Sequence, residues 1–398
     1  MSSHDPIAAL EIGTTNTTLA IGEPEGDNRI RIAAICTIPS TGVRKSQIIE
    51  ISQAAHSVDS VLKSMEREFH YAIGQAYLAV SGPHIRTKYL DTQWQLLGKT
   101  VEDDDLREIY NRSLETGLDP DERMLLDESE IGYGIDGHDT PDPKGMAGHV
   151  LMRRSLCIHG DAKRVADAKS AVQRAKLEIS DVYFAGSCAA NAVLKPADRA
   201  AGVLTIDLGG GSTTYTVHEN GRMIHAGVVG VGGDHVTNDI RSAFSITHTQ
   251  AEELKKNVSA QVGGEGSNRI SVASTTPGFD PVTISRRAAE TVVNARLQEL
   301  FAVILDQLDR ENLAHRFNSG VVLTGGVAAT PGIAALAEHV LGRRTRIGTF
   351  NDGIVPCENA PEAHTYATVA GLLLAAYRSQ DPHANSNPLK RLFGGFFG

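Results

Sequence analysis

Residues 202–221 read GVLTIDLGGGSTTYTVHENG, and this stretch decides the fold. Its β-branched and apolar residues flank a glycine-rich turn, a pattern that predicts strand, turn, strand. Residues 7–23, IAALEIGTTNTTLAIGE, repeat the plan and align Glu11 with Asp207, an acid just before each turn. A third strand is predicted after each hairpin, at 29–39 and at 221–233. The repeat predicts a duplicated α/β domain with a cleft between its halves.

The two turns carry the residues that a phosphate site needs. Glycines let backbone N–H groups approach an anion closely, and hydroxyls add donors. Glu11 and Asp207 would then lie beside the phosphates, where they suit Mg²⁺ bound through water, and Asp207 is the candidate catalytic carboxylate. Either hairpin alone could be an ordinary tight turn, but the pair favours nucleotide binding. The predicted phosphate-binding residues are Gly13, Thr14, Thr15 and Asn16 in the first half and Gly209, Gly210, Gly211, Ser212 and Thr213 in the second.

A third glycine-rich element follows at 320–333, GVVLTGGVAATPGI. It predicts a strand, the pair Gly325-Gly326 followed by Val327, and a helix entered around Pro331. Bare backbone at the two glycines would let a flat ring and its ribose lie against the chain. Longer helices are predicted at 46–70 and 285–308 from apolar residues at three- and four-residue steps.

Composition excludes several classes. The 398 residues carry a net charge of −10, which argues against a nucleic-acid-binding surface. Four cysteines lie far apart without CxxC spacing, so we expect small buried hydrophobes in a reducing compartment. The chain opens without a secretory signal pattern, and the longest apolar run, 368–377, is about half of a membrane span, so a buried helix is expected there.

The three motifs in this order resemble the superfamily of actin, DnaK-type chaperones and sugar kinases. The resemblance implies two α/β lobes, ATP with Mg²⁺ in the cleft, and hinge motion between the lobes. The segment AEELKK (251–256) is similar to the superfamily's E-x-x-K helix, which implies that Glu252 and Lys255 flank the ribose and adenine. Gly232 and Gly233 match the glycine pair that approaches the phosphates.

Within the superfamily the chain resembles the FtsA family of bacterial division proteins over nearly its whole length. The segments GVGGDHVTNDIRSAF (230–244) and YATVAGLLLAAY (366–377), and an insert with Tyr133–Asp136, carry the likeness. It implies a first lobe at 1–82, completed by 161–200 and about 355–378, an inserted subdomain at 83–160, and a second lobe at 201–354 with its own insert at about 230–310. A linker at 379–387 and an amphipathic helix at 388–398 would follow.

Two departures from the family pattern concern hydrolysis. The first turn has Asn16-Thr17 where the family usually has a lysine, and Thr214 stands where the second turn usually has an acid. Losing a cation and a carboxylate near the phosphates leaves the cradle intact but weakens the case for turnover. We therefore expect ATP binding with at most slow hydrolysis.

The last residues, NPLKRLFGGFFG (387–398), have the composition of an interfacial anchor. As a helix they would place leucines and phenylalanines on one face and cations on the other, although the glycines disfavour helix in water. Docking on the protein's own core, or on a partner protein, are the alternatives. A single short anchor binds weakly, so many copies along a polymer would be needed for firm attachment. The residues predicted to contact membrane are Leu389, Lys390, Arg391, Leu392, Phe393, Phe396 and Phe397.

The partner predictions follow from the resemblance. Residues 285–308 alone indicate an ordinary packing helix, but the likeness implies that Arg296 and Glu299 border a site for the C-terminal peptide of FtsZ. The expected protein polymerises, binds anionic lipid and other division proteins, and lies at the cytoplasmic face of the inner membrane at the division site. A PilM-like scaffold of a pilus or secretion assembly, and a kinase or chaperone ATPase, are the competing classes.

Overall fold

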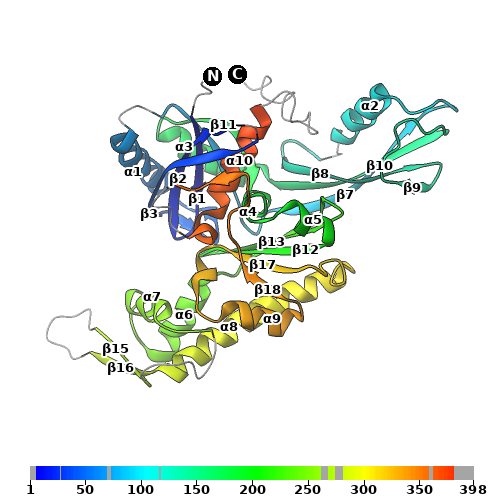
Figure 1. Ribbon diagram of the computed structural model, residues 1–398. Helices are drawn as coiled ribbons and strands as arrows, with labels where there is room; N and C mark the ends of the chain where they lie inside the picture. Colours follow the sequence, from blue (N-terminus) through cyan, green and yellow to red (C-terminus); the bar gives the residue numbers. More distant parts are fainter. Residues whose placement is uncertain are drawn as a thin grey trace.

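A computed structural model describes residues 6–26, 28–69, 73–115, 118–260, 268–273, 281–357 and 362–380. The predicted linker, apart from its first two residues, and the predicted terminal helix lie outside the described residues. The chain forms two stacked α/β lobes and a third sheet that projects to one side (Figure 1).

The first lobe is built on a six-stranded sheet of order β11-β6-β1-β2-β3-β19. Alternate residues of β1 enter two different cores: Leu10 packs beneath α1 and α3, and Ala9 packs beneath α4 and α10. Both faces of the sheet are therefore covered, which explains the near-continuous apolar character of its strands. The strands are β1 (Ile7–Ile12), β2 (Asn16–Pro24), β3 (Ile30–Pro39), β6 (Gln75–Val80), β11 (Glu178–Phe184) and β19 (Ile354–Val355). The helices are α1 (Ile51–Phe69), α3 (Ala162–Arg174), α4 (Ala185–Val193) and α10 (Ala367–Gln380).

The second lobe repeats this sheet in the order β14-β13-β12-β17-β18. In both lobes the first hairpin is antiparallel, a third strand extends it antiparallel, and two later strands add parallel on the other side. The duplication predicted from the two hairpins is thus present in the backbone. The strands are β12 (Val203–Leu208), β13 (Thr213–Glu219), β14 (Arg222–Val229), β17 (Gly320–Thr324) and β18 (Thr345–Ile347). The helices of this half are α5 (Pro196–Ala201), α6 (Gly233–Phe244), α7 (His248–Lys256), α8 (Arg286–Arg310) and α9 (Ile333–Leu341).

The projecting unit is a four-stranded sheet of order β7-β10-β8-β9 with one helix, α2, against it (Figure 1). Arg153 and Glu128 form an ion pair of 2.8 Å inside it, and both side chains are only 2% exposed. Arg153 also donates to Ser113 Oγ at 2.8 Å and lies over the Tyr110 ring. The elements are β7 (Arg86–Gln95), α2 (Asp103–Leu114), β8 (Arg123–Ile135), β9 (His138–Thr140) and β10 (Val150–Asp161).

Several boundaries differ from the sequence prediction. The helix predicted from residue 46 begins at Ile51, because a small hairpin of β4 (Val43–Arg44) and β5 (Gln47–Ile48) precedes it. Lys45 and Ser46 form its turn with φ of 50° and 56°, left-handed values that an α-helix cannot include. The remaining short elements are β15 (Arg269–Val272), β16 (Val282–Ser285), η1 (Gly326–Ala329) and η2 (Ala363–Tyr366).

The apolar run at 368–377 is a buried helix, as predicted, within α10. Among the described helices, none is both long enough and apolar enough to span a bilayer. All four cysteines are free; Cys157 and Cys188 are buried, whereas Cys36 and Cys357 are only half-buried.

Candidate functional site

The two glycine turns have the same hydrogen bond. Gly13 N donates to Asn16 O at 2.9 Å, and Gly209 N donates to Ser212 O at 3.1 Å. In both turns a Cβ on the glycine would lie 2.8 Å from that carbonyl oxygen, closer than real Cβ atoms come. Glycine is therefore required at the base of each turn, and the sequence alignment of the halves corresponds to one repeated backbone geometry.

The turns face one another across the junction of the lobes. A Cβ at Gly210 would strike Thr15 Oγ1, and one at Gly211 would strike Thr14 Oγ1. Within the described residues no hydrogen bond engages the backbone N–H of Gly210 or Gly211. Two turns about 200 residues apart in sequence therefore bring bare backbone and hydroxyl groups to one place, the arrangement that binds phosphate.

A third segment completes this junction, and the sequence interpretation missed it. The segment contains Ser46, in the β4–β5 turn, whose backbone N–H donates to Thr14 Oγ1 at 2.7 Å. The Ser46 hydroxyl lies 2.8 Å from that of Ser212. The backbone of the exposed Lys45 lies directly against Gly211. The β4–β5 hairpin thus brings a lysine backbone to the second turn, whereas the first turn has Asn16-Thr17. The sequence analysis did not predict this turn, because it assigned residues 46–70 to a helix.

Glu11 and Asp207 occupy the penultimate positions of the first strands of the two hairpins, and both residues are half-buried. Burial raises the pKa of Glu11 to about 8, and the charge of Asp207 adds to the shift. Burial raises the pKa of Asp207 to about 6, against the opposing hydrogen bond from Thr368 Oγ1 at 3.5 Å. The carboxyl groups of Glu11 and Asp207 thus influence each other electrostatically, and their surroundings favour the neutral form of each. A divalent cation between them would restore the charged forms.

The start of α6 is tied to the second turn. Gly233 N donates to Gly209 O at 3.0 Å and Asp234 N donates to Gly210 O at 2.8 Å. A Cβ at Gly232 would lie 2.5 Å from Gly209 O and 2.6 Å from Gly210 O, so this contact requires glycine. The predicted glycine pair thereby fixes the orientation of α6 toward the turn.

The predicted E-x-x-K residues lie beside the same helix end. Lys255 Nζ is 2.7 Å from Glu252 Oε2 and donates to Thr237 Oγ1 at 2.9 Å. Burial tends to raise the pKa of Glu252, but hydrogen bonds from Lys255 and Thr237 outweigh it and lower that pKa. Glu252 therefore stays ionised, and Lys255 pairs with it beside Gly233 at the start of α6.

The third glycine element closes over the acid of the second lobe. Gly325 has φ of 86°, and a Cβ there would lie 2.5 Å from Asp207 Oδ1, so only glycine fits. A Cβ on Gly233 would approach Val327 Cγ2 at 2.9 Å, whereas Gly326 faces open space. The residues predicted for phosphate, metal, ribose and base are thus gathered around one junction.

Arg296 and Glu299 lie elsewhere, on α8. Arg296 makes a two-pronged ion pair with Asp239 of α6, with Nε and Nη2 at 2.6 and 3.1 Å from the carboxylate oxygens. Glu299 pairs with the same guanidinium. The membrane residues predicted at 389–397 lie outside the described residues.

Comparisons of the sequence with known proteins point to bacterial cell division proteins. A family model described as cell division protein FtsA matches residues 204–371. Cell division protein FtsA of Bacillus subtilis (strain 168) is 29% identical over 357 residues, which are 88% of this chain and 80% of the relative. That of Escherichia coli (strain K12) is 27% identical, covering 95% of this chain and 91% of the relative.

Solved structures extend the likeness of fold. The PilM–PilN type IV pilus biogenesis complex contains a chain that superimposes with a TM-score of 0.66 at 16% identity, covering 93% of this chain and 98% of that one. MreB5 of Spiroplasma citri bound to AMPPNP gives 0.53 at 14% identity, covering 94% and 97%.

The duplicated sheets and the facing turns define the class: this is a protein of the actin-like ATPase fold. Within that class, the chain is similar to cell division protein FtsA, through the family model over residues 204–371 and through relatives of that name that are 27–29% identical.

Proposed function

We propose that the junction between the lobes binds ATP with Mg²⁺. The observation that carries the proposal is the pair of facing turns, in which glycine is required and backbone N–H groups stay unengaged within the described residues. The donor set fits a polyphosphate, since N–H and hydroxyl groups converge from both lobes. Glu11 and Asp207 fit a hydrated Mg²⁺, which usually keeps several waters and few carboxylate ligands. A neighbour of the same fold, MreB5 of Spiroplasma citri, is bound to AMPPNP.

The residues present favour binding over turnover. When bound, Mg²⁺ supplies neutralisation of phosphate charge. Asp207 is the candidate to orient a water molecule. Its cross-strand partner is Thr214, which has a hydroxyl where the family usually has a second carboxylate. Lys45 contributes positive charge beside the second turn. We therefore expect ATP to act mainly as a ligand that holds the two lobes together, with slow hydrolysis.

Titration calorimetry with ATP and ADP in the presence of Mg²⁺ tests the nucleotide proposal. Gly232→Ala should weaken binding at least about tenfold, because its Cβ displaces the backbone that supports the second turn. Gly132→Ala is the matched control, since open space surrounds that glycine in the projecting sheet. An absence of nucleotide uptake by folded wild-type protein would refute the proposal.

We propose further that the protein acts in bacterial cell division as a polymer that tethers FtsZ to the cytoplasmic membrane. Its similarity to proteins named for cell division supports the role, and the actin-like fold supports assembly of copies in a row. Attachment would come from residues 388–398, whose sequence combines phenylalanines with Lys390 and Arg391. Because one short anchor is weak, polymerisation would determine how much protein is bound.

Liposome co-sedimentation of the full chain tests the attachment. Phe396→Glu with Phe397→Glu should abolish pelleting with anionic vesicles, while nucleotide binding stays unchanged. Unchanged pelleting of the double variant would remove the anchor from the proposal.

Binding of the FtsZ C-terminal peptide is proposed at α8, where Arg296 is the cation. Asp239 already neutralises that guanidinium, so an incoming carboxylate must compete with it. A PilM-like scaffold is the second candidate, supported by the TM-score of 0.66 to the PilM–PilN complex. Fluorescence anisotropy with a labelled FtsZ tail peptide separates the two, because only the division role requires that binding.

A further inference from the structure

A recess with an unusual charge lies away from the nucleotide junction, at the far end of α10. Its volume is about 290 Å³, and its lining includes three guanidinium groups, those of Arg29, Arg199 and Arg378. They come from the start of β3, from α5 and from the last turn of α10. Thr368, at the other end of α10, lies beside Asp207, so ten residues of helix, roughly 15 Å, separate the recess from the nucleotide acids.

The three arginines have little negative charge around them. None of them forms an ion pair with a described residue. Asp198, the acid adjacent to Arg199 in sequence, is bound to Arg346 at 2.8 Å instead. Asp352 is the one carboxylate in the described lining, and it is exposed. The described lining therefore carries a net positive charge.

Two of these cations are also poorly solvated. Burial lowers the pKa of Arg199 to about 10, and the nearby charge of Arg378 lowers it further, while Asp198 acts in the opposite direction. Burial likewise lowers the pKa of Arg378. Keeping two like charges together in a half-buried place costs free energy unless an anion compensates them.

Neutral partners satisfy only part of the donor capacity. Arg199 Nη2 donates to Asn191 Oδ1 at 2.8 Å and to Ala190 O at 3.2 Å, and Arg378 Nε donates to Asn28 Oδ1 at 2.7 Å. A guanidinium has five N–H donors, so most donors of this cluster have no protein acceptor among the described residues. The two asparagines hold the guanidiniums in place and leave those donors available for a ligand.

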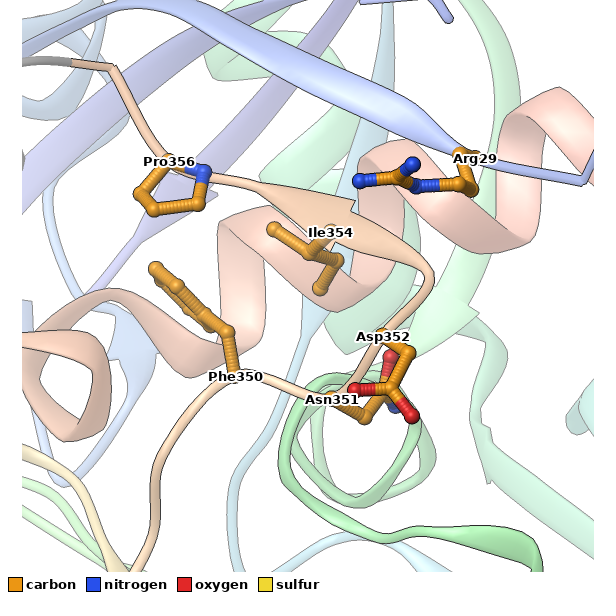
Figure 2. A pocket seen from close by; sticks show the side chains of 6 residues that line it. All are labelled: Arg29, Phe350, Asn351, Asp352, Ile354 and Pro356. Carbon is orange, nitrogen blue, oxygen red and sulfur yellow. The ribbon is translucent and has the colours of Figure 1, made fainter. Parts of the chain in front are cut away.

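A second recess, of about 630 Å³, adjoins this cluster and shares Arg29, Asn351 and Asp352 with it; Phe350, Ile354 and Pro356 form its apolar side. Figure 2 shows Arg29 on one side and Phe350, Ile354 and Pro356 on the other. A ligand with an anionic group joined to an apolar part would match both recesses. Residue 380, the end of α10, follows Arg378 by two positions, and the segment with the terminal phenylalanines continues from there.

We propose that this arginine recess is a binding site for a phosphate group, independent of the nucleotide junction. Arginine forks suit phosphate because two N–H groups bind two oxygens side by side. The source of the phosphate is either an anionic phospholipid headgroup, with its glycerol and acyl part along Phe350 and Ile354, or free phosphate.

The test is calorimetric titration of the full-length protein in saturating Mg-ADP, which keeps the nucleotide junction occupied. One arm uses inorganic phosphate, a second uses dihexanoyl-phosphatidylglycerol below its micelle concentration, and a third uses the zwitterionic choline lipid. Arg29→Gln and Arg378→Gln should each weaken binding at least about tenfold, the effect of losing one charge-assisted hydrogen bond. Arg316→Gln is the matched control, because that arginine pairs with Glu219 on the surface.

Tighter binding of the glycerol lipid than of phosphate assigns the site to the membrane; equal binding assigns it to free phosphate, and both support the site. Arg29 is exposed, so the Arg29→Gln variant should fold. It can therefore decide the test even if Arg378→Gln is unstable. Lack of saturable binding in saturating Mg-ADP, or equal affinity in the arginine variants, would overturn the proposal while leaving nucleotide binding untouched.

Discussion

Replacing Glu11 by glutamine should change how stability depends on pH. Burial raises the pKa of Glu11 from 4.5 to about 8, so the folded state holds a proton that the unfolded chain has lost over that window. An acid with a raised pKa destabilises the fold progressively as pH rises through the window. The raised pKa of Glu11 lowers the free energy of unfolding by roughly 4 kcal/mol at pH 8, since one pKa unit is about 1.4 kcal/mol. Glutamine stays neutral and avoids this cost.

The measurement is scanning calorimetry of wild type and Glu11→Gln between pH 4.5 and 8.5 in EDTA. Buried histidines such as His218 have lowered pKa values and oppose the trend below pH 6.5, but they are common to both proteins and cancel in the difference. The variant's Tm should exceed that of wild type by about five degrees at pH 8 and by little at pH 4.5. Glu219→Gln, at the end of β13, serves as the matched control.

Adding Mg²⁺ with ATP should narrow the gap, because a divalent cation favours the charged form of Glu11. A difference in Tm that stays constant from pH 4.5 to 8 would refute the reasoning. It would mean that water reaches the carboxylate freely, and the argument for a cation between Glu11 and Asp207 would lose its electrostatic basis.

Two further predictions concern ion pairs outside the junction. Glu128→Ala should destabilise the projecting sheet by about 3–5 kcal/mol, because it leaves the buried Arg153 without its carboxylate partner. Fluorescence of Trp94, the only tryptophan, reports unfolding of that sheet. A loss of stability below about 1 kcal/mol would contradict the prediction. Asp239→Asn should strengthen binding of the FtsZ tail peptide severalfold by releasing Arg296, measured by anisotropy; weaker binding would indicate that Asp239 positions the arginine instead of competing for it.

The repeated hairpins made the central fold predictable. Residues 7–23 and 202–221 share a spacing of acid, glycine and hydroxyls, and that spacing corresponds to one turn geometry in both lobes. Local pattern was sufficient here because each turn is closed by a hydrogen bond between residues three apart. The buried helix at 368–377 was equally clear from its apolar run.

Contacts between distant segments were not predictable from pattern. The helix predicted from Ser46 was extended through β5 because the apolar spacing continues there, whereas Lys45 and Ser46 have left-handed φ values and contact Thr14 and Gly211. The pairing of Arg296 with Asp239 joins residues 57 apart, so the family resemblance that made Arg296 a candidate peptide-binding cation gave no sign of this partner. Both contacts join segments that are distant in sequence, so only the three-dimensional structure reveals them.

The position of α10 connects the separate sites. Its Thr368 donates to Asp207 in the nucleotide junction, and its last turn places Arg378 in the arginine recess. Between them, a Cβ at Gly371 would strike the backbone oxygen of Cys188 in α4, so the two helices pack backbone to backbone. A displacement of Asp207 on binding nucleotide would therefore be carried along a stiff helix rather than absorbed by loose side chains. The segment that leaves α10 after residue 380 contains the proposed anchor. The helix thus links the proposed nucleotide junction to the residue after which the segment with the proposed anchor begins.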